Sequence, residues 1–152
     1  MKRIFAFAAI LSLVASLLPI PASAVEYGGL GGRPANPRAD NPRSESIFIY
    51  ELPQNESVRD GIRLFNNTGE TKTIGVGSVD SAPSNDGAFA CSQEADPKND
   101  VGSWITFDTD SITLNDGENR VVNFTVKTPQ NASVGEHSGC ITIRDTQQAP
   151  AA

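Results

Sequence analysis

The sequence alternates apolar and polar residues in short runs that are separated by turn signals. The run "RVVNFTVKT" places Val122, Phe124 and Val126 on one side, with polar residues between them. Successive side chains of a β-strand point to opposite faces, so this pattern predicts a strand with one buried face. No window of the sequence shows a convincing helical period. The chain is therefore expected to be all-β.

Similar runs recur along the chain, and each predicts a further short strand. They are "SIFIYEL" (Ser46–Leu52), "GIRLFNN", "TKTIGVGSV", "SWITF", "SITL" and "HSGCITIRD". The residues expected to face inward include Ile62, Leu64, Ile74, Val76, Ile112 and Leu114. About seven short strands within about 100 residues are typical of an immunoglobulin-like two-sheet antiparallel sandwich. We assign this sandwich to residues 46–145.

Residues 1–24 have the pattern of a secretory signal peptide. Lys2 and Arg3 form a basic start, Ile4–Leu18 is an almost unbroken apolar run, and Ala22 and Ala24 are small residues at the expected cleavage site. A retained membrane anchor is the alternative, which the prolines that follow the apolar run disfavour. The mature protein is expected to be secreted or in the cell envelope, after cleavage near Ala24.

Charge and composition restrict the partners and the flanking segments. The chain has 18 acidic and 12 basic residues, which disfavours nucleic acid or an anionic membrane as a partner. Contact with a membrane is expected only through an anchor that this chain does not contain. Residues 25–45 are rich in Gly, Pro and Asn and predict a disordered arm or linker, and residues 146–152 predict a C-terminal linker.

The two cysteines of the chain, Cys91 and Cys140, are expected to form a disulfide, because an exported protein matures in an oxidising compartment. Closing a loop of about 50 residues would be worth roughly 4 kcal/mol on the chain-entropy model. A zinc site lacks ligands, since a single histidine cannot complete a four-ligand site with two thiolates. No cofactor is expected.

The same alternation indicates where the disulfide lies. Ile141 and Ile143 share one face of the last predicted strand, so Cys140 points to the other. Cys91 lies in the long irregular passage Ser81–Ser103, which is too long to stay untethered in a compact domain. The disulfide is thus expected to hold this passage across the outer face of the last strand.

Candidate chemistry is sparse, and the chain is expected not to be an enzyme. His137 has the parity of Ile141 and is expected to pack at the start of the strand over the edge of the core; no nucleophile accompanies it in a recognisable arrangement. The carboxylates between Asp96 and Asp110 could hold calcium, but "SIT" follows as a strand, which favours solvated turn residues. No metal site is therefore assigned.

Aromatic residues are the first candidates for ligand contact. Trp104, the only tryptophan, is expected to anchor the core, with a sugar-stacking platform as the alternative. If a ligand-binding face exists, Tyr50 and Phe89 are the residues expected on it.

The order of these elements resembles a known family. The passages "IYELPQNESVRDGIRLFNNTGETKTIGVGSVDS", "GSWITF" and "ITLNDGENRVVNFTVKTPQNASVGEHSGCITI" resemble the first immunoglobulin-like domain of WxL-interacting bacterial surface proteins and of related anchored surface proteins. The likeness covers about Ser46 to Arg144. Its elements are the turn at Leu64–Thr68, the Trp104–Ile105 pair, the turn at Leu114–Glu118 and the passage Pro129–Ile141.

The resemblance implies a peptidoglycan-binding type of domain. We therefore expect a non-catalytic binding domain, whose partner is a cell-wall polymer such as peptidoglycan or another surface protein. The alternatives are a protein-assembly or chaperone-like module that uses an exposed sheet edge, and an accessory carbohydrate-binding module of an enzyme.

Overall fold

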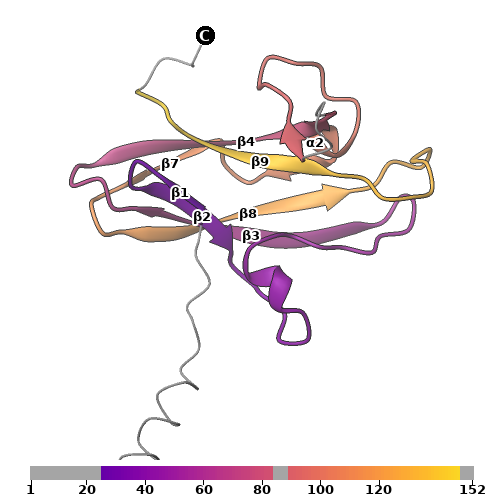
Figure 1. Ribbon diagram of the computed structural model, residues 1–152, viewed down its shortest axis with the longest axis horizontal. Helices are drawn as coiled ribbons and strands as arrows, with labels where there is room; N and C mark the ends of the chain where they lie inside the picture. The colour runs from indigo at the N-terminus through magenta and orange to yellow at the C-terminus, as the bar shows by residue number, and fades with distance from the viewer. Residues whose placement is uncertain (1–24, 84–88, 148–152) are drawn as a thin grey trace, which may run out of the picture.

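The protein is a sandwich of two antiparallel sheets, seen in the computed structural model, which describes residues 25–83 and 89–147 (Figure 1). The five-stranded sheet has the order β1-β2-β3-β8-β6. Its strands are β1 (Val25–Tyr27), β2 (Leu30–Pro34), β3 (Ser57–Asn66), β8 (Asn119–Lys127) and β6 (Ile105–Phe107). In the second sheet β4 (Lys72–Ala82) pairs with β5 (Ala90–Cys91), β7 (Ser111–Leu114) and β9 (Gly139–Asp145). Two short helical turns, η2 (Pro42–Glu45) and α2 (Val101–Trp104), complete the described chain. The all-β, immunoglobulin-like sandwich predicted from the sequence is confirmed.

The core between the sheets consists of the residues that the alternation placed inward. Its buried members are Ile62, Leu64, Ile74, Val76, Leu114, Val122, Phe124 and Val126. Phe124 is 1% exposed, so truncating it to alanine would cost about 3–5 kcal/mol. Trp104 and Ile112 pack against this cluster and are partly buried.

The last strand, β9, runs antiparallel to β4 and has the predicted parity. Ile141 lies opposite Ser78 and Ile143 opposite Val76, on the core side, whereas Cys140 lies opposite Val79 on the outer side. Val79 is nevertheless 1% exposed. Another part of the chain therefore covers the outer face of the sheet.

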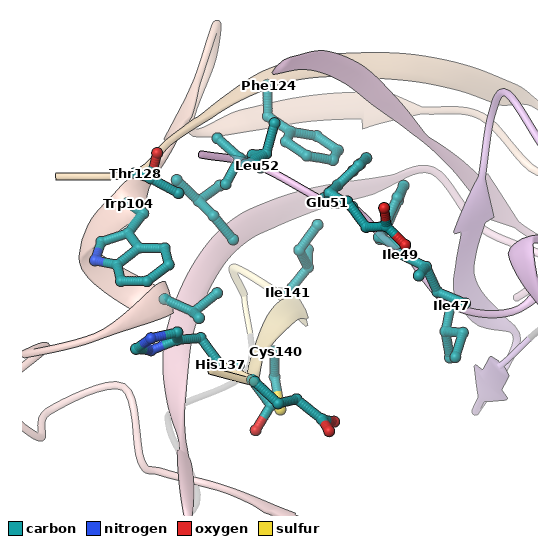
Figure 2. Close-up of a pocket in the computed structure, with 18 of the residues that line it drawn as sticks. Ile47, Ile49, Glu51, Leu52, Trp104, Phe124, Thr128, His137, Cys140 and Ile141 are labelled. Carbon is teal, nitrogen blue, oxygen red and sulfur yellow. The ribbon is translucent and has the colours of Figure 1, made fainter. Parts of the chain in front are cut away.

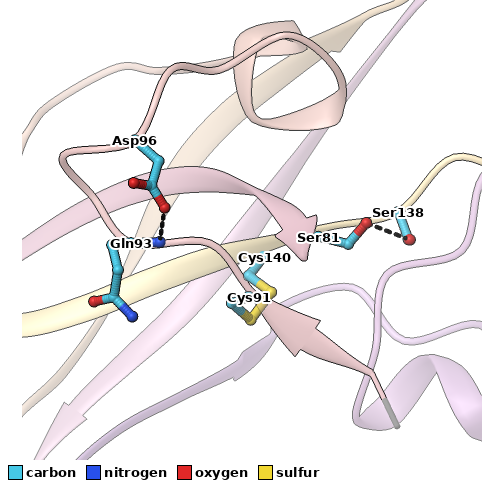
Figure 3. The surroundings of a disulfide bond; sticks show 6 residues. All are labelled: Ser81, Cys91, Gln93, Asp96, Ser138 and Cys140. Atoms are coloured by element: carbon cyan, nitrogen blue, oxygen red, sulfur yellow. Dashed lines mark hydrogen bonds between the residues drawn. A yellow bond between two sulfur atoms is a disulfide. The ribbon is translucent and has the colours of Figure 1, made fainter. Parts of the chain in front are cut away.

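The first part of residues 89–104, which we call the strap, supplies this cover, whereas Trp104 at their end packs against the core cluster. Cys91 at its start is joined to Cys140 by the predicted disulfide (Figure 3). Further along, Glu94 accepts a hydrogen bond from Thr142 at 2.7 Å and forms an ion pair with Arg144 at 3.1 Å. All of these β9 side chains point away from the core, so the strap crosses the outer face as predicted.

Asp80 holds the other end of the strap. Its carboxylate accepts hydrogen bonds from the backbone N–H groups of Asn99, Asp100 and Gly102, at 2.6, 3.0 and 2.7 Å. Burial by itself raises the pKa of Asp80, but these donors, together with nearby Lys98, outweigh it and hold the pKa below its ordinary value. The start of α2 is thus fixed to β4 by one carboxylate.

The expectation of a disordered arm over residues 25–45 was wrong. Val25–Tyr27 and Leu30–Pro34 form a hairpin, and β2 pairs with the second half of β3 from Leu30↔Asn66 to Pro34↔Ile62. Gly28 and Gly29 form the turn with φ values of 57° and 85°, which glycine adopts without strain. A Gly-Gly pair between two extended runs is a hairpin signal, although the Gly, Pro and Asn content of the segment predicts a linker.

The strand predicted at Ser46–Leu52 is also absent. This segment is extended and its even-numbered side chains Phe48, Tyr50 and Leu52 pack on the core, but it joins neither sheet. The period-2 pattern therefore reported the side-chain directions correctly and the backbone pairing incorrectly.

The predicted signal peptide (1–24) and the end of the predicted C-terminal linker (148–152) lie outside the described residues. Within the described residues, no helix has the length and apolar character needed to span a membrane.

Candidate functional site

An open groove of about 1400 Å³ runs between β9 and residues 46–54, which we call the facing segment (Figure 2). Ile47, Ile49 and Leu52 line it from the facing segment, and Ile141 and Ile143 line it from β9. Small-molecule sites usually enclose about 300–1000 Å³. The size and the open, elongated course of this β9 groove suit an extended occupant better than a compact one.

The floor of the groove is the core of the sandwich. Ile62, Phe124 and Val126 line it, and all three are enclosed members of the core cluster. Phe48 stands edge-on to Phe124 at a ring-centroid distance of 5.1 Å. The groove therefore lies directly over the core, whose side chains stay buried beneath it.

The rim carries the exposed large apolar side chains of the domain. Among the described residues these are Ile47, Phe89 and Val134, with exposed fractions of 44%, 64% and 99%, and each of them lines the groove. Scattered single apolar residues on a surface need no explanation, but a cluster around one concave site marks a site of interaction.

Backbone groups of β9 also point into the groove. Ser81 N–H donates to Ser138 C=O, and Thr146 N–H donates to Thr73 C=O, so the even-numbered residues of β9 bond to β4. In an antiparallel ladder bonded and non-bonded pairs alternate, so the N–H and C=O groups of Gly139, Ile141 and Ile143 face the other way. No backbone hydrogen bond joins these groups to any other part of the described chain. Among the described residues, the edge of β9 that faces the groove is thus unpaired, and we call it the free edge.

The two ends of the groove carry opposite charge. Arg43 lies at the end near Ile143, because η2 contacts β2, and in β2 an added Cβ on Gly32 would lie 2.5 Å from Ile143 Cδ1. Glu136 lies at the other end. Neither Arg43 nor Glu136 forms an ion pair within the described residues.

His137 forms the wall at the Glu136 end. Its ring lies 4.8 Å from the ring of Trp104, and the side chain is 20% exposed, consistent with the position over the core edge that its parity predicted. Nε2 is 3.0 Å from the carbonyl oxygen of Ser133, and Nδ1 is 2.7 Å from Asp100 Oδ1. The Ser133 carbonyl and then the Asp100 carboxylate raise the pKa of His137. Both groups accept a hydrogen bond, and only the protonated imidazole ring has an N–H group for each of them.

The two aromatic residues predicted for a ligand face both line the groove but differ in availability. Phe89 is exposed at the rim, whereas Tyr50 lies along the facing segment, half-buried. The Tyr50 hydroxyl donates to Asp60 Oδ2 at 2.7 Å. Burial, and then the Asp60 carboxylate, raise the pKa of Tyr50. Its polar end is therefore already occupied, which leaves the ring as a wall of the groove.

The acidic turns do not assemble a metal site among the described residues. No three His, Cys, Asp or Glu side chains gather there in a way that could hold an ion. Asp108 pairs instead with Arg59, and Asp96 accepts from the backbone N–H of Gln93 at 2.8 Å (Figure 3). The turn interpretation of these residues agrees with their contacts.

The free edge and the facing segment were not found from the sequence. The alternation of Ile141 and Ile143 identified the strand, but it carries no information on how many neighbours the strand has. The available signal was the absence of edge protection, since "GCITI" contains neither proline nor lysine.

Comparison with known proteins returns a distant structural match. No family model matches the chain, and no curated protein matches it. Among solved structures it is similar to the ASH / PapD-like domain of human CEP192 (PapD-like domain 7), with a TM-score of 0.40 and 10% identity over 86% of this chain and 83% of that chain. The sandwich assignment rests on the strands described above, and membership of the WxL-interacting group stays a prediction.

Proposed function

We propose that this chain is a secreted, non-catalytic domain of the cell envelope that binds an extended segment of another surface protein in the β9 groove. One observation carries the proposal. The exposed large apolar side chains of the described residues, Ile47, Phe89 and Val134, all surround the opening of the β9 groove. Covering this opening would bury apolar surface at about 25 cal/mol per Å².

The apolar lining favours a polypeptide over a glycan. Sugar-binding sites combine aromatic platforms with free polar groups, but the Tyr50 hydroxyl is bonded to Asp60, and aliphatic side chains outnumber aromatic ones in the lining of the groove. Phe89, at 64% exposed, is the observation that keeps a wall glycan as the second candidate, because an exposed ring can stack on a sugar.

The test uses the chain as it is secreted, immobilised and presented with two fractions of the source organism's envelope. One is purified peptidoglycan freed of protein, and the other is solubilised surface protein treated with muramidase. Retention of a defined surface protein that is sensitive to protease and insensitive to sugar competitors supports the proposal. Retention on protein-free peptidoglycan that muropeptides compete away contradicts it in favour of the glycan.

Two variants connect retention to the groove. Ile47→Asp together with Val134→Asp places charges on two exposed rim positions, where little folding cost is expected. The matched control is Thr106→Asp, at an exposed position of β6 that does not line the groove. Loss of the bound protein with the rim variant and its retention with the control is the expected result; equal retention by both rules out the groove as the site.

A further inference from the structure

We propose that the partner segment enters the β9 groove as a β-strand, pairs with the free edge of β9 and extends the sheet that contains β4. This inference rests on the proposed function and specifies how the partner is held. Figure 2 shows the place, where Ile141 on β9 and the side chains of the facing segment stand on opposite sides of the opening. An extended polypeptide is the class of ligand whose N–H and C=O groups match such an edge.

β9 differs from the other edge strands in its length. β1 and β6 end the larger sheet with three residues each, and β5 and β7 have two and four, whereas β9 has seven. Proteins usually protect a long edge with proline, lysine, a bulge or a covering segment. The outer face of β9 is covered by the strap, but its edge is open to the groove.

The place beside β9 that no described residue pairs with corresponds to a defined strand of the fold. Immunoglobulin-like sandwiches pair their sixth strand, F, with C on one side and with the last strand, G, on the other. By sheet order β4 and β9 occupy the places of C and F, and no described strand occupies the place of G. Ile141 and Ile143 are consequently only partly buried although they face the core.

The geometry determines which residues of the inserted strand must be apolar. Directly opposed residues in an antiparallel pair point their side chains to the same face. A residue bonded to the free N–H and C=O of Ile141 therefore also points its side chain toward the core, as Ile141 does. The residues that bond to β9 must be the apolar ones, and those between them point toward the strap side and can be polar.

Charge complementarity completes the description of the occupant. Antiparallel pairing is slightly more stable than parallel pairing, and it places the N-terminal end of the strand beside Arg43 and the C-terminal end beside Glu136. The four residues of β9 from Gly139 through Thr142 are uncharged. The partner strand is thus acidic at its N-terminal end, alternately apolar in the middle and basic at its C-terminal end.

The probe is the peptide acetyl-Asp-Asp-Val-Thr-Val-Thr-Val-Lys-Lys-amide, titrated into the full secreted chain by calorimetry and by amide NMR. Its reversed-charge isomer, with the lysines first and the aspartates last, is the matched control. The inference expects the first peptide to bind and the isomer to bind at least about tenfold more weakly, the equivalent of 1.4 kcal/mol. Equal binding of both, or tighter binding of the isomer, overturns the assigned orientation and charge.

Backbone methylation separates strand pairing from simple apolar contact. N-methylation of the valines removes the N–H groups that would face β9, whereas N-methylation of the threonines removes only those that face away. We expect the valine set to weaken binding at least about tenfold, and the threonine set to leave it within about threefold. Equal loss in both sets overturns pairing with β9.

Two variants of the domain test the same backbone pairing on the β9 strand. Ile141→Pro removes a free edge N–H, whereas Ile141→Ala removes the same side chain and keeps the N–H; proline is tolerated where the N–H of an edge strand faces outward. Proline is expected to weaken the peptide at least about tenfold beyond alanine, with near-ultraviolet circular dichroism checking the fold of each variant. Equal affinities contradict the inference, and if the proline variant fails to fold the methylated peptides decide it.

These outcomes are distinguishable from failure of the proposed function. If a surface protein is retained through the rim residues but none of the peptides distinguishes the two methylation sets, the groove binds protein by another mode. If the free chain forms a concentration-dependent dimer in which the Ile141 and Ile143 amides are protected, a second copy occupies the groove and the proposed partner strand is excluded.

Discussion

Val79 and Cys140 lie directly opposite each other in the register of β4 and β9, on the face that points away from the core. Val79 is 1% exposed because the strap, held by the Cys91–Cys140 disulfide, lies over this face. The disulfide therefore has a different role from one that joins two sheets through a core. It attaches an irregular segment to the outside of one sheet.

Replacing Cys91 with serine should loosen the strap and leave the sandwich folded. The free energy of unfolding is expected to fall by about 2–5 kcal/mol. Limited proteolysis should show new cleavage between Ser81 and Ser103, while the β-sheet circular dichroism is retained. Cys140→Ser should have the same effect. The free energy of unfolding of the double variant should fall no further than that of either single variant, since all three remove the same disulfide bond. Unchanged cleavage in this passage would refute the role of the disulfide.

Asp80→Asn should destabilise the protein at neutral pH by about 1–3 kcal/mol, because three backbone donors lose a charged acceptor. The lowered pKa of Asp80 means that its contribution is present above the unfolded-state pKa and is lost as the pH falls through the folded-state value. Urea unfolding at neutral and at acid pH measures the loss of stability in the variant and the pH dependence of the Asp80 contribution. Asp96→Asn, in an exposed turn, is the control and should change stability by less than about 0.5 kcal/mol. Similar losses in both variants would contradict the account of Asp80.

His137 should titrate above its ordinary pKa of about 6.5. Its contribution to stability is full below the unfolded-state pKa and is lost as the pH rises through the folded-state value. NMR titration of the ring protons measures the shift, and Asp100→Asn should bring the pKa down, since it removes a carboxylate acceptor at 2.7 Å. A midpoint at or below about 6.5 in the unmodified protein would be inconsistent with the contacts described.

Tyr50 should resist ionisation while the protein is folded. Burial and the bond to Asp60 raise its pKa, so the stability that they contribute is present below the ordinary tyrosine pKa of about 10 and is lost as the pH rises through the folded-state value. The ultraviolet absorbance of tyrosinate reports this in a Tyr27→Phe variant, in which Tyr50 is the remaining tyrosine. Ionisation with an ordinary midpoint would show that the hydroxyl is solvated.

The sequence predicted the parts of the fold in which side-chain direction is decisive. Alternation at Ile62, Phe124 and Ile141 identified strands and their buried faces, because burial selects every second residue. The position of Cys140 outside the core followed from the same parity. The disulfide followed from the oxidising compartment that the predicted signal peptide implies.

Backbone pairing could not be predicted in the same way. The facing segment alternates like a strand but has no partner, whereas Leu30–Pro34 is rich in glycine and pairs with β3 along its whole length. Both outcomes depend on which segments are adjacent in space, which local pattern does not encode. The groove lies where no described strand pairs with the second edge of β9. It therefore depends on how the sheets assemble, which the local sequence pattern does not encode.

Amide hydrogen exchange along β9 tests the central claim most directly. In the free domain the amides of Cys140, Thr142 and Arg144 bond to β4 and should be protected, whereas those of Ile141 and Ile143 face the groove and should exchange rapidly. Adding the acidic-to-basic peptide should slow exchange at Ile141 and Ile143 and change the other three little. Uniform protection of all five amides in the free, monomeric domain would show that the edge of β9 is already paired, and would contradict the account.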